Sequence, residues 1–216
     1  MKHCMIIFIF AGLLVTGSTR AQEWRQLFNG KDLSGWEQVG PGEFVVEDGT
    51  LKTVGGMGML MYGAEKFGNI VLRVVYTVKD NDVNSGVFIR IPEKTTDPWV
   101  AVNTGYEIQI DNGMRHLHDD YHCTGVLYSL SKALCYPQKR PEEWNTMEIT
   151  LDGPKTLVYV NGRKVTEYTE GDPVPPEKRW FEPDRGPRPE SGYIGLQNHD
   201  RESTAYFREV AVRLLK

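Results

Sequence analysis

The stretch GYEIQIDN (Gly105–Asn112) alternates apolar and polar side chains, and its polar positions carry two carboxylates and one amide. Side chains of a β-strand point alternately to its two faces. A strand whose Tyr and Ile residues fill the core therefore presents Glu107, Gln109 and Asp111 together on the other face. A solvated outer face is the simple alternative. Solvated faces tend towards Lys, Thr and Ser, whereas this set is rich in acceptors and has no lysine, so we favour a functional site.

Two other stretches repeat this pattern of polar side chains on one face of a strand. In NSGVFIR, Asn84 and Arg90 have the same parity, and in GLQNHD so do Gln197 and His199. Planar amides, carboxylates and a guanidinium offer paired hydrogen bonds to vicinal hydroxyl groups. If the three strands are neighbours in one sheet, their polar faces together predict a cleft for a sugar.

Strand signals dominate the rest of the chain. Runs rich in β-branched and aromatic residues are separated by turn residues, for example at 43–47, 70–78 and 125–130. The pair Asn161–Gly162 marks a hairpin turn. We expect one short helical turn, near 141–144, and no longer helix. Many short strands separated by turns predict an all-β antiparallel sandwich of the jelly-roll kind.

One segment, Gly171–Ser191, interrupts this rhythm because it is rich in proline and charge. It is too long for an ordinary connection, and long loops in compact domains are usually functional or disordered. Trp180 and Phe181 argue against disorder because large aromatic side chains seek burial. We predict a loop that forms part of the rim of the cleft, with Arg179 or Arg185 reaching in.

Eight stretches along the chain resemble the 3-keto-disaccharide hydrolase family. They are LFNGKDLSGW, EFVVEDGTL, NSGVFIR, GYEIQIDN, TGVLYSL, EEWNTMEI, VYVNGRKV and GYIGLQNHDRESTAYFREV. The resemblance implies one domain over residues 22–216, with a fold similar to concanavalin-A-like lectins and glucanases and a concave carbohydrate-binding face. It also implies glycoside substrates whose sugar carries a ketone at carbon 3, made by a partner sugar 3-oxidoreductase.

A ketone at carbon 3 acidifies the hydrogen on carbon 2, so a base can remove that hydrogen to form an enolate. The group on carbon 1 then leaves, and the addition of water completes a net hydrolysis. Such a site needs a base, an acid for the leaving oxygen and an electrophile for the enolate oxygen. The candidate acid–base residues are Glu107, Asp111 and His199. The candidate substrate-binding residues are Arg90 (as the electrophile or as an orienter of a carboxylate), Gln109, Gln197, Asn84, Tyr128 (which is equally well explained as a packed strand residue) and Trp180.

Two other functions fit the same pattern. A direct glycosidase would use two carboxylates, but the Cα atoms of Glu107 and Asp111 should lie about 13 Å apart, whereas retaining and inverting enzymes hold their carboxyl groups about 5–5.5 Å and about 6.5–9.5 Å apart. Gln109 also stands where glucanases of this fold usually have an aspartate. A non-catalytic sugar-binding module would need aromatic platforms, for which Trp99, Trp144 and Trp180 are candidates.

Metal binding is an open question in the sequence. RHLHDDYHC (Arg115–Cys123) holds three histidines and two aspartates, but its spacing matches no closed zinc pattern, so we favour a solvated or rim loop. A divalent cation such as calcium or magnesium on Glu107 and Asp111 is a separate possibility, because carboxylate oxygens suit hard ions. Such an ion would serve as the electrophile at the enolate.

The N-terminal residues predict export. Lys2 and a short apolar run, followed by small residues, form a secretory signal peptide over residues 1–21. The run is too short to span a membrane, and we expect the mature protein to be periplasmic or extracellular with no membrane span. Cys123 and Cys135 then either pair as a disulfide or remain free thiols. The net charge is −4 with the two signs mixed, which argues against a nucleic-acid partner.

Overall fold

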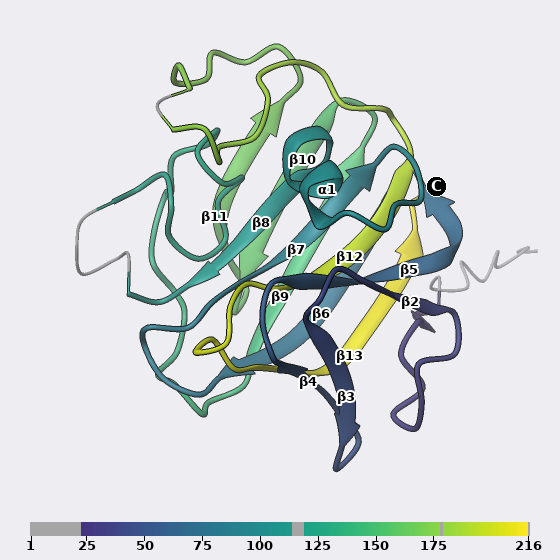
Figure 1. Ribbon diagram of the computed structural model, residues 1–216. Coiled ribbons are helices and arrows are strands. Elements are labelled where there is room, and N and C mark those ends of the chain that lie inside the picture. The colour runs from purple at the N-terminus through teal and green to yellow at the C-terminus, as the bar shows by residue number, and fades with distance from the viewer. Residues whose placement is uncertain (1–22, 114–118, 178, 216) are drawn as a thin grey trace, which may run out of the picture.

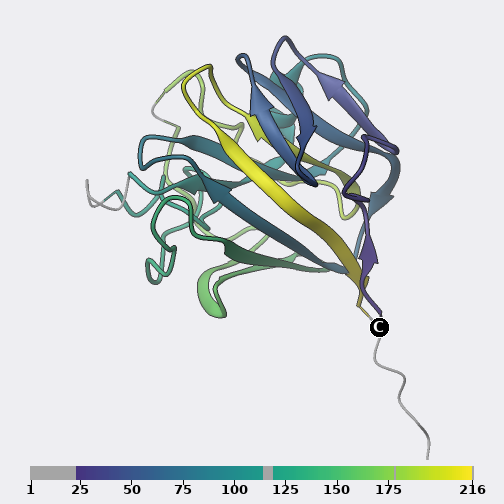
Figure 2. The same cartoon turned by 90° about the horizontal axis from the view of Figure 1, so that it is seen from below.

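Two antiparallel β-sheets pack face to face in the computed structural model, which describes residues 23–113, 119–177 and 179–215 (Figure 1, Figure 2). The predicted sandwich is therefore confirmed. The predicted signal peptide lies outside the described residues. The described part of the chain contains no helix that is long and apolar enough to cross a membrane.

The larger sheet has eight strands in the part of the chain that the structure describes. Its order is β11 (Arg163–Thr169), β10 (Lys155–Val160), β9 (Asn145–Asp152), β6 (Ile70–Val78), β13 (Ala205–Leu214), β4 (Thr50–Val54) and β3 (Glu43–Glu47), and β1 (Arg25–Gln26) pairs with β13. Asn161 and Gly162 both have positive φ in the turn between β10 and β11, as the hairpin signal predicts.

The smaller sheet has five strands among the described residues and carries the polar stretches singled out above. Its order is β2 (Trp36–Val39), β5 (Gly58–Phe67), β12 (Gly192–Asn198), β7 (Asn84–Ile91) and β8 (Tyr106–Asp111). In the β7–β8 pair Asn84 lies opposite Asp111. Strand β7 thus stands between β8 and β12, so the three polar stretches are neighbours.

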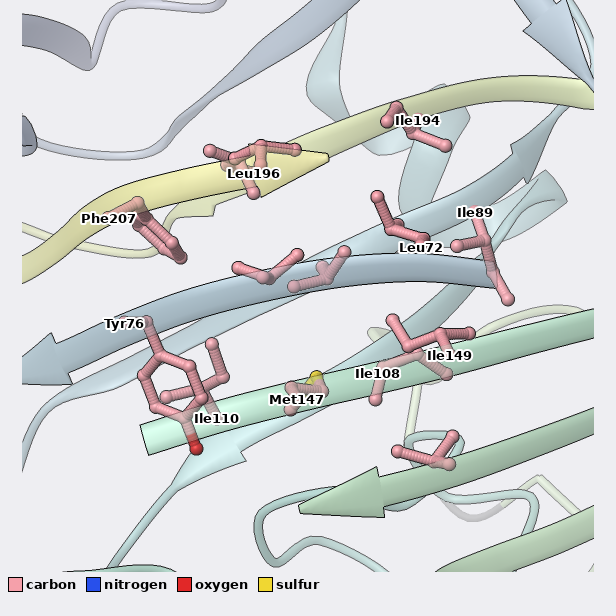
Figure 3. Close-up of a cluster of buried hydrophobic side chains, with 14 of the residues drawn as sticks. Leu72, Tyr76, Ile89, Ile108, Ile110, Met147, Ile149, Ile194, Leu196 and Phe207 are labelled. Atoms are coloured by element: carbon pink, nitrogen blue, oxygen red, sulfur yellow. The ribbon is translucent and has the colours of Figure 1, made fainter. Parts of the chain in front are cut away.

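The main core fills the space between the two sheets (Figure 3). The larger sheet contributes Leu72, Tyr76, Met147, Ile149 and Phe207, and the smaller sheet contributes Ile89, Ile108, Ile110, Ile194 and Leu196. Because the isoleucines of β8 point into this core, the residues between them must point to the outer face of the smaller sheet.

A second, smaller apolar cluster covers part of that outer face. It consists of Val39, Met59, Met61, Phe88, Ile91, Ala101 and Val102. The last two residues belong to a short helix, α1 (Pro98–Thr104), which the sequence reasoning missed. Its signal was Asp97 before Pro98: the Asp97 carboxylate accepts the N–H of Trp99 at 3.0 Å, and proline suits the first turn.

The segment 125–130, expected to be a strand, is instead a series of turns with one isolated bridge, Ile108 to Leu127. Gly125 and Ser129 have positive φ, which interrupts an extended conformation. The segment still covers the free edge of β8, since the N–H of Tyr128 donates to the carbonyl of Glu107 at 2.9 Å. Residues 141–143 form a turn, near the helical turn that we expected.

Candidate functional site

A pocket of about 660 Å³ lies on the outer face of the smaller sheet. Its lining residues are Met57, Asn84, Trp99, Val102, Glu107, Gln109, Asp111, Asp119, His122, Tyr128, Arg179, Trp180, Phe181, Gln197 and His199. Side chains from β7, β8 and β12 form one part, which we call the floor: Asn84, Glu107, Gln109, Asp111 and Gln197. Loop residues form a second part, which we call the rim: Asp119, His122, Tyr128, Arg179, Trp180 and Phe181. Met57, Trp99, Val102 and His199 complete the lining.

Strand β8 supplies three residues of the floor, as its alternation predicts. Glu107, Gln109 and Asp111 are all buried and line the pocket. The Gln109 side-chain amide donates to Asn84 Oδ1 at 3.2 Å, and Asp111 Oδ1 accepts the N–H of Gly113 at 2.9 Å. The other Gln109 side-chain atom, Oε1, is buried with no hydrogen-bond partner among the described residues, and it is therefore available to a bound hydroxyl group.

The Glu107 carboxyl group lies over a glycine of the neighbouring strand. A Cβ added to Gly86 would stand 2.5 Å from Glu107 Oε1, so only glycine leaves room for the carboxyl group there. Burial raises the pKa of Glu107 to about 8, although its hydrogen bond with the Gln197 amide acts in the opposite direction. Desolvation disfavours the charged carboxylate more strongly than this one hydrogen bond favours it.

The C-terminal end of β12 contributes the predicted Gln197, and His199 follows it. Gln197 is buried, and its Oε1 has no hydrogen-bond partner among the described residues. His199 is more exposed, with its Nδ1 2.7 Å from Asp200 Oδ2. Asn84, Gln197 and His199 all line the pocket, so their predicted placement is confirmed, while their chemical roles remain predictions.

Arg90 is the predicted site residue that the structure does not bring to the pocket. Its φ is +56°, and the pairing of β7 with β12 shifts register between Tyr193 and Gly195. This bulge breaks the alternation on which the prediction depended. The Arg90 guanidinium instead donates to the carbonyls of Gly153 at 2.5 Å and Pro189 at 3.2 Å, so its assignment to substrate binding is wrong.

The predicted rim loop does border the pocket, through Arg179, Trp180 and Phe181. Trp180 is 79% exposed even though its ring centroid lies 5.3 Å from that of Trp99 and 5.6 Å from that of Phe181. A tryptophan this exposed beside a pocket offers a free aromatic face to a ligand. Of the two arginines expected to reach in, Arg179 lines the pocket, whereas Arg185 pairs with Glu182 at 2.8 Å inside the loop.

The loop is fastened to the rest of the pocket by Arg188, a buried residue that the sequence reasoning did not single out. Its guanidinium donates to the carbonyls of Gly105 at 2.8 Å and Asn103 at 2.9 Å and lies 5.0 Å from the centre of the Tyr106 ring. These acceptors lie at the end of α1 and immediately before β8. Arg188 therefore couples the position of the rim loop to the strand that carries Glu107.

Tyr128 lines the pocket, as its assignment to substrate binding requires. Burial, with a smaller contribution from the nearby Glu107 carboxylate, raises the pKa of Tyr128 to about 12. The hydroxyl group therefore stays protonated at neutral pH and can donate a hydrogen bond. Asp119 and His122, from the His- and Asp-rich segment for which we favoured a solvated or rim loop, also line the pocket, so these two residues do lie at the rim.

The remaining sequence predictions concern metal, thiols and a tryptophan. Among the described residues no group of three or more His, Cys, Asp or Glu is arranged to hold a metal ion, and His116 and His118 lie outside those residues. A cation on Glu107 and Asp111 stays a prediction. Cys123 and Cys135 are free thiols. Trp144 is not among the lining residues and packs instead against the Arg208 guanidinium.

Comparison with known proteins gives a consistent picture. The 3-keto-alpha-glucoside-1,2-lyase-like domain family matches residues 23–213. A crystal structure named "putative glycosyl hydrolase" from Parabacteroides distasonis is 28% identical, with a TM-score of 0.74 over 89% of this chain and 100% of that chain. No curated protein gives a significant match.

Two further structures resemble the chain in fold alone. Carbohydrate-binding module CBM66 from Bacillus subtilis has a TM-score of 0.57 at 16% identity, over 83% of this chain and 95% of that chain. The Emp46p carbohydrate recognition domain has a TM-score of 0.53 at 12% identity, over 88% of this chain and 94% of that chain. The sandwich is thus of the lectin-like type expected from the resemblance.

Proposed function

Since the chain belongs to the 3-keto-alpha-glucoside-1,2-lyase-like domain family and has a carbohydrate-active role, we propose that it cleaves 3-keto-glycosides by elimination followed by hydration. The observation that carries this proposal is the Glu107 carboxyl group, buried on the floor of the pocket beside Gln197. Elimination needs one strong base close to carbon 2, and a direct glycosidase needs two carboxyl groups close together.

Glu107 is the proposed base for the hydrogen on carbon 2. Its pKa of about 8 makes it a stronger base than an ordinary glutamate, while part of it is still ionised at neutral pH. General bases work best when their pKa lies near the operating pH. The ketone makes the hydrogen on carbon 2 acidic enough for a carboxylate of this strength to remove it. In an unoxidised sugar the same hydrogen is not acidic enough.

The enolate oxygen needs a donor in place of Arg90. Tyr128 and Arg179 both line the pocket, and the Tyr128 hydroxyl group, whose pKa is raised to about 12, and the Arg179 guanidinium are both hydrogen-bond donors. A preorganised donor aimed at a developing oxyanion is often the largest single contribution to catalysis. The amides of Gln109, Gln197 and Asn84 would hold the hydroxyl groups of the sugar. Asp111 and His199 remain candidates for the transfer of the other protons.

Incubation with methyl 3-keto-glucoside beside methyl glucoside tests the proposal. We expect release of methanol from the oxidised sugar only, because the unoxidised sugar has no acidic hydrogen on carbon 2. Cleavage of methyl glucoside alone would establish the direct glycosidase and overturn the elimination mechanism. Product analysis by NMR identifies both the released alcohol and the sugar.

A non-catalytic carbohydrate-binding module is the second candidate, and one observation favours it. Trp180 presents an exposed ring next to Trp99, which is the kind of platform on which sugars stack. Binding of methyl 3-keto-glucoside or methyl glucoside in calorimetry, with no turnover of either, would establish this function instead.

The compartment and the partner follow from the same reasoning. We expect the chain to be exported, as its N-terminal residues predict, and to act on the product of a sugar 3-oxidoreductase. Fractionation of cells that express the full chain would test the first expectation. Conversion of an unoxidised disaccharide only when such an oxidoreductase is added would test the second.

A further inference from the structure

A histidine–aspartate pair in the rim has no role in the function proposed so far. His122 Nδ1 lies 2.7 Å from Asp119 Oδ2, and the Asp119 main-chain carbonyl also accepts the N–H of His122 at 3.5 Å. Asp119 is itself held, because its Oδ1 accepts the N–H of Tyr121 at 3.1 Å. Both members of the pair line the pocket. The contact through Nδ1 leaves the His122 Nε2 atom available for other partners.

Packing connects this pair to the proposed base. The His122 and Tyr128 rings form a T-shaped contact, with 4.9 Å between the ring centroids. The N–H of Tyr128 in turn donates to the carbonyl of Glu107 at 2.9 Å. His122 is thus held beside β8 by a ring contact and a carboxylate, as an acid–base group needs to be.

The other histidine of the pocket is held less firmly. His199 also contacts a carboxylate, Asp200, at 2.7 Å, but the His199 side chain is 44% exposed, whereas that of His122 is 25% exposed. Asp200 does not line the pocket, and no aromatic ring among the described residues packs against His199. A more enclosed imidazole loses less of its interaction with a substrate to water.

On this geometry, and resting on the proposed function, we propose that His122 is the proton donor to the leaving oxygen on carbon 1, with Asp119 as its positioning residue. In the elimination step Glu107 takes the hydrogen on carbon 2 as a proton, and the electron pair of that bond forms the double bond between carbons 1 and 2. The bond from carbon 1 to the leaving oxygen breaks, and His122 Nε2 gives its proton to that oxygen.

The hydration step returns both residues to their starting states. Neutral His122 takes a proton from water as the water oxygen bonds to carbon 1, and the Glu107 carboxylic acid gives its proton to carbon 2. The sum of the two steps is one 3-keto-glycoside and one water converted into one 3-keto sugar and one alcohol. Asp119 accepts a hydrogen bond from Nδ1 throughout, which keeps the tautomer that the transfers at Nε2 require.

The dependence of the rate on the leaving group tests this assignment. A methoxide leaving group needs a proton, whereas 4-nitrophenoxide is stable without one. We expect His122→Gln to lower kcat/KM for methyl 3-keto-glucoside by about 10²–10⁴-fold and for 4-nitrophenyl 3-keto-glucoside by less than about tenfold. Asp119→Asn should show the same selectivity with a smaller loss, because it disturbs the orientation of the imidazole and not the imidazole itself.

His199→Gln is the matched control, since it removes the other histidine that contacts a carboxylate at the pocket. We expect any loss in this variant to be equal for the two substrates, and melting curves verify that each variant folds. Equal losses for both substrates in folded His122→Gln, or the selective loss in His199→Gln instead, would overturn the assignment. Wild-type protein that cleaves neither substrate would overturn the proposed function, and this assignment with it.

Discussion

The floor of the pocket is built from strands β7, β8 and β12, whereas its rim is built from the loops around 119–128 and 179–181. Backbone ladders on both sides of β7 fix the positions of the floor residues, and the two β8 carboxyl groups there are buried. The rim depends on single side chains such as Arg188, and it includes Trp180, which is 79% exposed.

This difference indicates a division of labour between reaction rate and affinity. Residues of a hydrogen-bonded sheet hold reacting groups to within the small tolerances that catalysis needs. An exposed ring on a loop contributes contact area to the bound substrate and to the transition state alike, so it affects binding more than rate. Changes in the floor should therefore lower kcat, as should changes in the reacting groups of His122 and Tyr128, whereas loss of the exposed Trp180 ring should raise KM.

The largest effect is expected for Glu107→Gln. The change removes the base and keeps the shape of the side chain, so kcat should fall by about 10²–10⁴-fold with the affinity for methyl 3-keto-glucoside nearly unchanged. Steady-state kinetics and calorimetry measure the two quantities. The control is Glu148→Gln, in β9 of the larger sheet. A Glu107→Gln variant that keeps more than half of wild-type turnover would place the base elsewhere.

The pH dependence of the wild-type rate comes next. Burial raises the pKa of Glu107 to about 8, and only the ionised carboxylate can accept a proton. As the pH rises towards that pKa the ionised fraction grows, so kcat/KM for 4-nitrophenyl 3-keto-glucoside, whose leaving group needs no proton from His122, should increase about tenfold per pH unit below it and level off above it. A profile measured between neutral and alkaline pH checks the sign. A rate that falls through the same range would mean that Glu107 acts as an acid.

Gly86→Ala changes the floor without removing any functional group. The new Cβ would lie 2.5 Å from Glu107 Oε1, so the carboxyl group must move. Because displacement of a catalytic group by about 1 Å can cost about 10²-fold, we expect kcat to fall by about 10–100-fold. Gly68→Ala is the control, since its Cβ would meet no atom closer than 3.8 Å. Equal activity in both variants would show that the position of Glu107 tolerates movement.

The smallest effect is expected for Trp180→Ala in the rim. Loss of one stacking face should raise KM about tenfold and leave kcat within about twofold. The melting temperature should hardly change, because the side chain is 79% exposed. Trp144→Ala, away from the pocket lining, should leave KM unchanged. A large loss of kcat in Trp180→Ala would remove the division between floor and rim.

The floor could be predicted from the sequence because it follows the period of a strand. Glu107, Gln109 and Asp111 keep strict alternation with core residues in β8, and the same rule places Asn84 and Gln197 correctly. The rule fails for Arg90, because the β-bulge beside it reverses the side chain, and no local sequence signal marks that bulge. Alternation is reliable only while the ladder stays regular.

The rim was less predictable for a physical reason. Loop residues are placed by individual contacts, such as those of Arg188 with Gly105 and Asn103, and these contacts join parts of the chain far apart in sequence. Composition was enough to predict that the loop with Trp180 borders the site. It was not enough to predict which arginine enters the pocket, or which side chains of the His- and Asp-rich segment line it.

The most direct test of the account follows the hydrogen on carbon 2. Methyl 3-keto-glucoside carrying deuterium at carbon 2 is incubated with wild-type protein, and the rate and the label in the sugar product are measured at early times, with an enzyme-free incubation of the product as the control. Removal of this hydrogen by Glu107 predicts slower cleavage than for unlabelled substrate. Exchange of the Glu107 carboxylic acid proton with water before it returns to carbon 2 predicts loss of the label to solvent. Cleavage at an unchanged rate with the label fully retained would contradict it.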